Sequence, residues 1–189
     1  DCDAGTNSFA YGVALAGTCE SCTADANSFA NGGTLSGTCL SCVGGDDCFG
    51  GDITGTCKGC VGDDNCFASS ETMSGTCHSC NAVNTSFAYQ GTLSASGQFI
   101  SCQANNSSFG YQAISFLGIC KDCIGEDYCF GGDNSGLVGD LAGECQGCIG
   151  DQYCFAYKAD LSGTCSSCLS DTFGFGSGTG AEITGTCDG

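Results

Sequence analysis

The sequence predicts an all-β, disulfide-rich repeat array, for three reasons. A unit of roughly 20 residues recurs nine times, and 21 of the 189 residues are cysteines. No stretch of 11 to 18 residues keeps the apolar spacing of a helix. Short strands joined by Gly, Asn and Asp turns are therefore expected to stack along one axis as a solenoid-like rod. We interpret residues 1–189 as a single array of nine Cys-x5-[Cys/Ser]-Phe repeats.

Each unit opens at a cysteine that forms the second half of a C-x-x-C motif. Only this second half is present at Cys2 and at Cys102. Six residues later comes Cys, Ser or once Gly, then always Phe, then Ala or Gly. The Phe is expected to be a repeated core residue, beside which the small neighbour lets a second backbone approach the ring. These core candidates are Phe9, Phe29, Phe49, Phe67, Phe87, Phe109, Phe130, Phe155 and Phe175.

Each unit closes with an apolar residue four positions before a cysteine and Gly two positions before it. This period of two predicts a strand, with Leu35, Gly37 and Cys39 on one side and Ser36 and Thr38 on the other. The fifth unit, where Phe99 replaces the closing cysteine, is expected to lack the apolar residue. Length varies between the Phe and this closing segment, which predicts a loop there.

The units fall into two classes. Units three, four, seven and eight carry an extra cysteine before the Phe, at Cys48, Cys66, Cys129 and Cys154, and have Val or Ile and then Gly after the opening cysteine. The other five are plain. The order is two plain, two cysteine-bearing, two plain, two cysteine-bearing and one plain, so a period of about 80 residues overlies the short one.

Two disulfide schemes are open, because spacing alone does not fix connectivity. The first closes each unit on itself and pairs extra cysteines between adjacent units, which leaves Cys80 unpaired. Its pairs are Cys2 with Cys19, Cys22 with Cys39, Cys42 with Cys57, Cys60 with Cys77, Cys102 with Cys120, Cys123 with Cys145, Cys148 with Cys165, Cys168 with Cys187, Cys48 with Cys66 and Cys129 with Cys154. The second bonds within each C-x-x-C and leaves Cys102, Cys2 and Cys187 without a partner in their own motifs.

Composition points to an oxidising, extracellular or cell-surface location. Leu, Ile, Val and Phe make up only 33 residues and the net charge is −18, values typical of disorder unless cross-links supply the stability. We expect that any secretion leader has been removed, and no apolar run reaches the roughly 20 residues of a membrane span. With 21 acidic residues and three Lys, nucleic acid is excluded as a partner.

Catalysis and cofactors find little support in the sequence. Redox C-x-x-C motifs occur singly at a helix start, whereas this chain repeats the motif throughout. Zinc fits the C-x-x-C spacing, but the extra cysteines do not fit four-ligand sets and His78 is the only histidine. Haem attachment needs C-x-x-C-H, which is absent, and one histidine supports no triad. We expect no enzyme, no resident metal and no cofactor.

Three surface features suggest binding instead. The acidic doublets Asp46-Asp47, Asp63-Asp64 and Glu126-Asp127 could gather Ca²⁺, although they lack the spacing of a calcium loop. Thr before the closing cysteine could form a hydroxyl column suited to ice or glycan, interrupted by Gln98, Ile119 and Glu144. N-glycosylation sequons start at Asn84, Asn105 and Asn106.

The stretch G-T-C-x-x-C followed by C-F, as in Gly37 to Cys42 with Cys48-Phe49, resembles cysteine-rich extracellular repeats of the furin-like and protist surface-antigen kind. The resemblance implies a disulfide-stapled extracellular rod without catalysis, and it carries no binding residues over to this chain. We expect a structural subunit of an extracellular fibre, filament or coat. Its partners would be copies of itself, added head to tail, because no atypical cap closes either end of the array. A binding module for ice, glycan or Ca²⁺ is the alternative.

Overall fold

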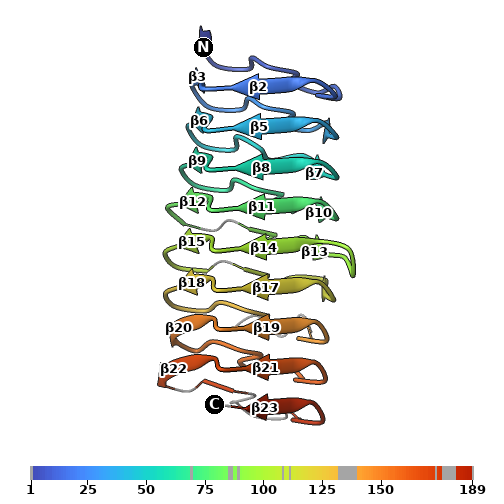
Figure 1. Cartoon of the computed structure of the whole chain (residues 1–189), viewed down its shortest axis with the longest axis vertical. Helices are drawn as coiled ribbons and strands as arrows, with labels where there is room; N and C mark the ends of the chain where they lie inside the picture. The colour runs from blue at the N-terminus through green and yellow to red at the C-terminus, as the bar shows by residue number, and fades with distance from the viewer. Residues whose placement is uncertain are drawn as a thin grey trace.

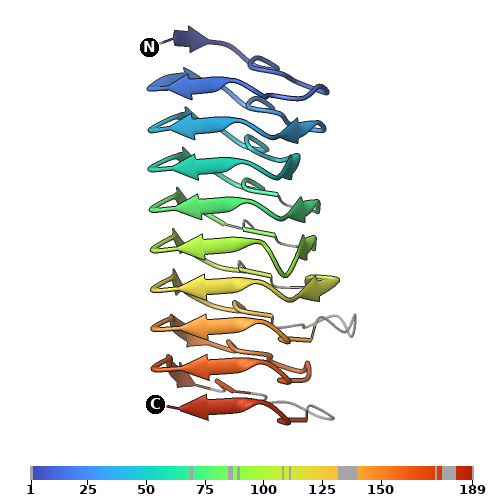
Figure 2. The same cartoon turned by 45° about the vertical axis from the view of Figure 1, so that its right-hand side comes forward.

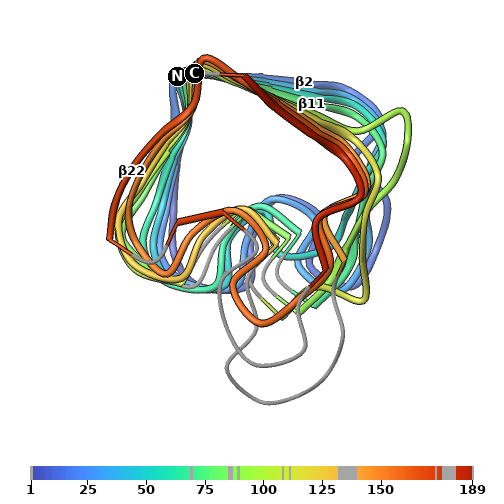
Figure 3. The same cartoon turned by 90° about the horizontal axis from the view of Figure 1, so that it is seen from below.

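The protein is an all-β solenoid, seen in a computed structural model that describes residues 2–68, 70–84, 87–88, 90–107, 109–110, 112–131, 140–172, 174–175 and 182–188. Parallel strands from successive repeats stack along the long axis, which confirms the predicted fold class (Figure 1). Within these described ranges no residue is helical. The turns superpose when viewed along the axis, and the two termini lie at the same corner but at opposite ends of the rod (Figures 2 and 3).

Three parallel sheets form the sides of the solenoid. Sheet A contains β1 (Cys2–Ala4), β3 (Cys22–Ala24), β6 (Val43–Gly44), β9 (Val61–Gly62), β12 (Asn81–Ala82), β15 (Gln103–Ala104), β18 (Ile124–Gly125), β20 (Ile149–Gln152) and β22 (Leu169–Thr172). Sheet B contains β4 (Thr34–Leu35), β7 (Asp52–Ile53), β10 (Thr72–Met73), β13 (Thr92–Leu93) and β16 (Ser115–Phe116). Sheet C contains β2 (Thr18–Glu20), β5 (Thr38–Leu40), β8 (Thr56–Lys58), β11 (Thr76–His78), β14 (Gln98–Ile100), β17 (Ile119–Lys121), β19 (Glu144–Gln146), β21 (Thr164–Ser166) and β23 (Thr186–Asp188).

The C-x-x-C motif is the corner between sheets C and A. Its first cysteine is the central residue of a sheet C strand, and its second lies at or directly before the start of a sheet A strand. Both are buried in the core. The residue before the second cysteine has a left-handed φ of 51° to 62°, which turns the backbone within two residues. This position holds Ser21, Ser41, Gly59, Ser79, Ser101, Asp122, Gly147 and Ser167.

The repeated Phe occupies another left-handed corner. From Phe9 to Phe155 the eight repeated Phe residues have φ of 50° to 58°, and in most turns the following Ala or Gly also has positive φ. Gly adopts this conformation without a steric cost, whereas five turns place Ala there despite its Cβ. The nine rings form one stack with centroids 4.7 to 5.1 Å apart, matching the spacing of parallel strands.

The glycine of the closing segment allows successive turns to approach each other. A Cβ placed on Gly55 would overlap the carbonyl oxygen of Gly37, and Gly37 stands in the same relation to Gly17. Any larger residue would therefore push one turn away from the next. This close approach accounts for Gly in eight of the nine units, whereas a Cβ on Gly17 in the first turn would meet no neighbouring atom.

The fifth unit does not lack its apolar residue, contrary to our expectation. Leu93 pairs in register with Met73 and with Phe116, so the apolar column of sheet B continues through this turn. Leu93 lies six residues before Phe99 instead of four, because two residues, Ala95 and Ser96, are inserted between them. Phe99 lies in register between Cys77 and Cys120, and its ring makes edge contacts with Phe87 and Phe109.

Candidate functional site

The core contains two adjacent columns of cysteine side chains. The sheet C column runs in register through Cys19, Cys39, Cys57, Cys77, then Phe99, and on through Cys120, Cys145, Cys165 and Cys187. The second column contains Cys22, Cys42, Cys60, Cys80, Cys102, Cys123, Cys148 and Cys168. Of the cysteines whose side chains the structure describes, only Cys187 is exposed. The side chain of Cys2 lies outside the described part.

The thiols of the two columns contact each other across the corner and along the rod axis. The Cys39 thiol lies beside the thiol of Cys42 across the corner and beside that of Cys57 in the next turn. The interaction with these two thiols lowers the pKa of Cys39, whereas the interaction with Cys39 raises the pKa of Cys42. From Cys42 onward each thiol of the second column also reaches a carbonyl one turn earlier, as Cys60 Sγ does at 3.4 Å from the Cys39 oxygen.

All twenty cysteines with described side chains are free thiols in this structure, so both disulfide schemes stay predictions. The contacts do not select between the schemes, because the Cys80 thiol meets Cys102 and Cys60 along its own column as well as Cys77 across the corner. Cys80, which the first scheme leaves unpaired, thus has Cys77 beside it, whereas the motif partner of Cys102 is replaced by Phe99.

The extra cysteines form short stacks of their own. Cys48 and Cys66 are fully buried in adjacent turns, close enough for their charges to interact. Burial is the main cause that raises the pKa of both thiols. Cys129 and Cys154 are equally buried in the second pair of cysteine-bearing turns. The structure thus places next to each other the extra thiols that the sequence pairs between units.

The threonines before the closing cysteine form an in-register column on the outer face of sheet C. Thr18, Thr38, Thr56 and Thr76 are consecutive neighbours in four turns. Gln98, Ile119 and Glu144 then interrupt the column, and Thr164 and Thr186 resume it. Four in-line hydroxyl-bearing side chains therefore repeat at strand spacing on one side of the rod.

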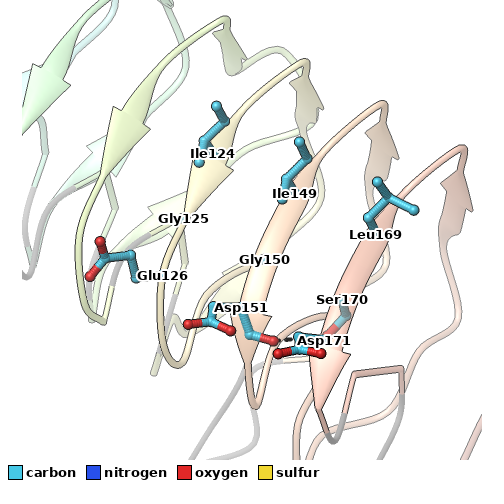
Figure 4. Close-up of a pocket in the computed structure, with 9 residues that line it drawn as sticks. All are labelled: Ile124, Gly125, Glu126, Ile149, Gly150, Asp151, Leu169, Ser170 and Asp171. Atoms are coloured by element: carbon cyan, nitrogen blue, oxygen red, sulfur yellow. Dashed lines mark hydrogen bonds between the residues drawn. The ribbon is translucent and has the colours of Figure 1, made fainter.

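An apolar strip on the outer face of sheet A was not singled out by the sequence. Ile124, Ile149 and Leu169 lie side by side and are 40%, 44% and 63% exposed. Glu126, Asp151 and Asp171 form a second column beside them, and together they line a groove of about 410 Å³ (Figure 4). The sequence feature that could have predicted this strip is the apolar residue directly after the opening cysteine. Because that cysteine points inward, the next residue of the strand points outward.

The acidic doublets and the sequons lie in turns on the surface of the rod. Asp46 Oδ1 accepts a hydrogen bond from the Asp64 backbone at 3.3 Å, and Asp64 Oδ1 accepts one from the Asn84 side chain at 3.2 Å. Carboxylates of successive turns therefore stabilise the turns by accepting hydrogen bonds from the next repeat. Asn105 and Asn106 are exposed. Across the described ranges, no three His, Cys, Asp or Glu side chains are arranged to hold a metal ion.

No family model, curated protein or solved structure matches the chain. Among the residues that the structure describes, no helix has the length and apolar character needed to cross a membrane.

Proposed function

We propose that the chain is a structural subunit of an extracellular fibre, filament or coat and that it assembles head to tail. The observation that carries this proposal is the contact between successive turns, which repeats in register along sheets A and C and can be made equally between two copies. At one end β1 and β2 have a strand neighbour on one side only, and at the other end the same is true of β22 and β23. Unpaired edges of parallel strands accept further strands.

The core columns continue to both ends and support the same conclusion. Phe9 and Leu15 at the first turn and Phe175 at the last are only partly buried, unlike their fully buried equivalents in the middle turns. Ile183, the last member of the sheet B column, is 53% exposed. Stacking the last turn of one copy on the first turn of another would bury these side chains and repeat the contact already made between turns. Such a heterologous contact produces open filaments.

Assembly of the 189-residue protein can be tested by negative-stain imaging and sedimentation. We expect filaments that lengthen with protein concentration and salt, because the net charge of −18 opposes association. Ile183→Asp should shorten them by placing a charge on the end surface. Ile114→Asp is the matched control, since Ile114 is 75% exposed in a turn in the middle of the rod. Wild-type protein that stays monomeric at high concentration, or equal effects of the two variants, would contradict the proposal.

A second candidate function is recognition of a regular surface, such as ice or a crystalline glycan, by the threonine column of sheet C. The observation that favours it is the unbroken register of Thr18, Thr38, Thr56 and Thr76. Thr56→Lys should abolish inhibition of ice recrystallisation or binding to an insoluble glycan. Thr164→Lys, outside the four-turn segment, is the control. Equal activity of both variants and wild type would show that the threonine column does not bind ice or glycan.

A further inference from the structure

Three tyrosines cluster on the surface of two adjacent cysteine-bearing turns. Tyr128 and Tyr153 are stacked, with ring centroids 5.0 Å apart and planes within 8° of parallel. Tyr157 meets both rings edge-on, at 6.2 Å from Tyr128 and 4.7 Å from Tyr153. All three side chains are half-buried, so their edges reach solvent. Two phenols are thus held side by side on successive turns.

Tyr128 and Tyr153 stand where other turns have residues that favour a left-handed backbone. This position, two before the repeated Phe, has positive φ at Asn7, Asn27, Asp47, Asn65 and Ser107. Both tyrosines adopt a φ of 53° there. A bulky residue is uncommon in this region, and the strain is offset in part by ring stacking, which contributes about 0.5–1.5 kcal/mol. The turn geometry alone therefore does not account for two aromatic residues at this corner.

The charges around the cluster favour electron loss from Tyr128 over electron loss from Tyr157. Asp127, beside Tyr128, has a buried Oδ1 without a hydrogen-bond partner among the described groups. A negative charge close to a phenol favours loss of an electron from it. In contrast, the ammonium of Lys158 lies 5.1 Å from the centre of the Tyr157 ring and disfavours electron loss there.

We propose that Tyr128 and Tyr153 form a site of oxidative coupling, at which a dityrosine bond joins two successive turns. A peroxidase-type oxidant with hydrogen peroxide removes one electron and the phenolic proton from each ring. The two radicals join through ring carbons ortho to the hydroxyls, and each ortho hydrogen then moves to its oxygen and restores the phenol. One carbon–carbon bond replaces two carbon–hydrogen bonds, and the two electrons and two protons convert one peroxide to two waters.

The parallel arrangement of the two rings makes Tyr153, and not Tyr157, the coupling partner of Tyr128. Equivalent carbons of the two stacked rings face each other at about the ring separation, so a modest side-chain movement brings the ortho carbons together. Tyr157 presents its plane at 62° to Tyr128 and lies farther from it. The link would be intramolecular, so it needs no assembly between copies and stands independently of the proposed filament.

The test uses dilute full-length protein treated with a peroxidase and hydrogen peroxide. After reduction and alkylation, cleavage at Glu126 and Glu144 places Tyr128 and Tyr153 on separate peptides. We expect dityrosine fluorescence and a linked peptide pair lighter than the sum of its parts by two hydrogen atoms. Tyr128→Phe and Tyr153→Phe should each reduce the linked pair to background, while Tyr157→Phe and the distant Tyr11→Phe should retain it.

Each Phe variant keeps a ring for stacking, and circular dichroism of each variant checks that the fold is retained. A linked pair that survives Tyr153→Phe but disappears in Tyr157→Phe would overturn the assignment. Dityrosine found only between molecules, or absence of the linked pair in wild type, would overturn it as well. Failure of the filament test would leave this outcome unaffected, since the coupling is measured in dilute protein.

Discussion

Cysteine-bearing and plain turns share one backbone but fill the same point of the core in different ways. In the cysteine-bearing turns the second residue after the opening cysteine is Gly, and a Cβ on Gly44 or Gly62 would lie 2.6 or 2.7 Å from the sulfur of Cys48 or Cys66. In the plain turn of Cys22, Ala24 fills this space and Ser28 replaces the extra cysteine. A methyl group and a sulfur atom therefore exclude each other at this point.

The polar contacts differ along with the packing. The buried Ser28 hydroxyl accepts a hydrogen bond from the Ser8 backbone at 3.0 Å and donates one to the Ala26 carbonyl at 3.4 Å. Cys48 Sγ donates to the Asp25 carbonyl at 2.9 Å and accepts a hydrogen bond from the Ser28 backbone at 3.4 Å. The comparison shows that the two unit classes are two solutions to one packing problem, each requiring two coupled residues.

The largest expected loss of stability comes from Gly62→Ala, which places a methyl group beside the sulfur of Cys66. The new methyl group would overlap Cys66 Sγ, and such overpacking of a core typically costs about 1–3 kcal/mol. Urea unfolding under reducing conditions measures the loss. The matched control is Ala82→Gly in a plain turn, where the loss should be about 0.5–1 kcal/mol. Adding Cys66→Ser to Gly62→Ala should restore stability, and failure of this rescue would show that another contact causes the loss.

A smaller effect is expected from pH in the reduced protein. Burial raises the pKa of Cys48 and Cys66 above the ordinary 9.0, so these thiols stay protonated in the folded state while unfolded thiols ionise. The contribution of each buried thiol to the free energy of unfolding is therefore fully present below pH 9. It is lost as the pH rises above 9, by about 1 kcal/mol per such thiol at pH 10. Unfolding curves at pH 8 and 10 measure this fall.

Replacement of Cys48 by serine is the control for this prediction. The Cys48→Ser variant should lose less stability between pH 8 and pH 10 than wild type, because one raised thiol pKa is gone. Fully oxidised protein should show little dependence in this range, since disulfides do not titrate. An equal pH dependence of the reduced and oxidised forms would show that groups other than thiols cause it.

The smallest effect should come from converting one class of turn into the other. Ala24→Gly combined with Ser28→Cys exchanges the methyl group for a sulfur atom, and volume-conserving changes cost less than about 1.5 kcal/mol. The new thiol would extend the stack that starts at Cys48, since the Ser28 backbone nitrogen already lies 3.4 Å from Cys48 Sγ. Ser28→Cys alone should cost more than the double change, and the reverse order would contradict the packing rule. Urea unfolding of both variants compares them.

The sequence by itself determined the repeat, the all-β class and the division into two kinds of unit. These properties are periodic, and a period of about 20 residues in a chain with strand-like alternation requires stacking in register. The inward orientation of the repeated Phe follows from the same regularity. The position of Leu93 was missed because it was counted at a fixed distance before Phe99. The two inserted residues, Ala95 and Ser96, are exposed and leave the register of sheet B intact.

Only the tertiary structure decided which side chains touch. The sequence period places each cysteine in a column. It does not determine how far the chain advances along the rod axis between Cys39 and Cys42. This advance decides whether a thiol contacts its own motif partner or the cysteine at the other end of its unit. The stacked tyrosines and the apolar strip of sheet A depend on side chains of turns 20 or more residues apart. Contacts of this kind arise from the stacking of turns, because no local preference of the backbone specifies a neighbour so distant in sequence.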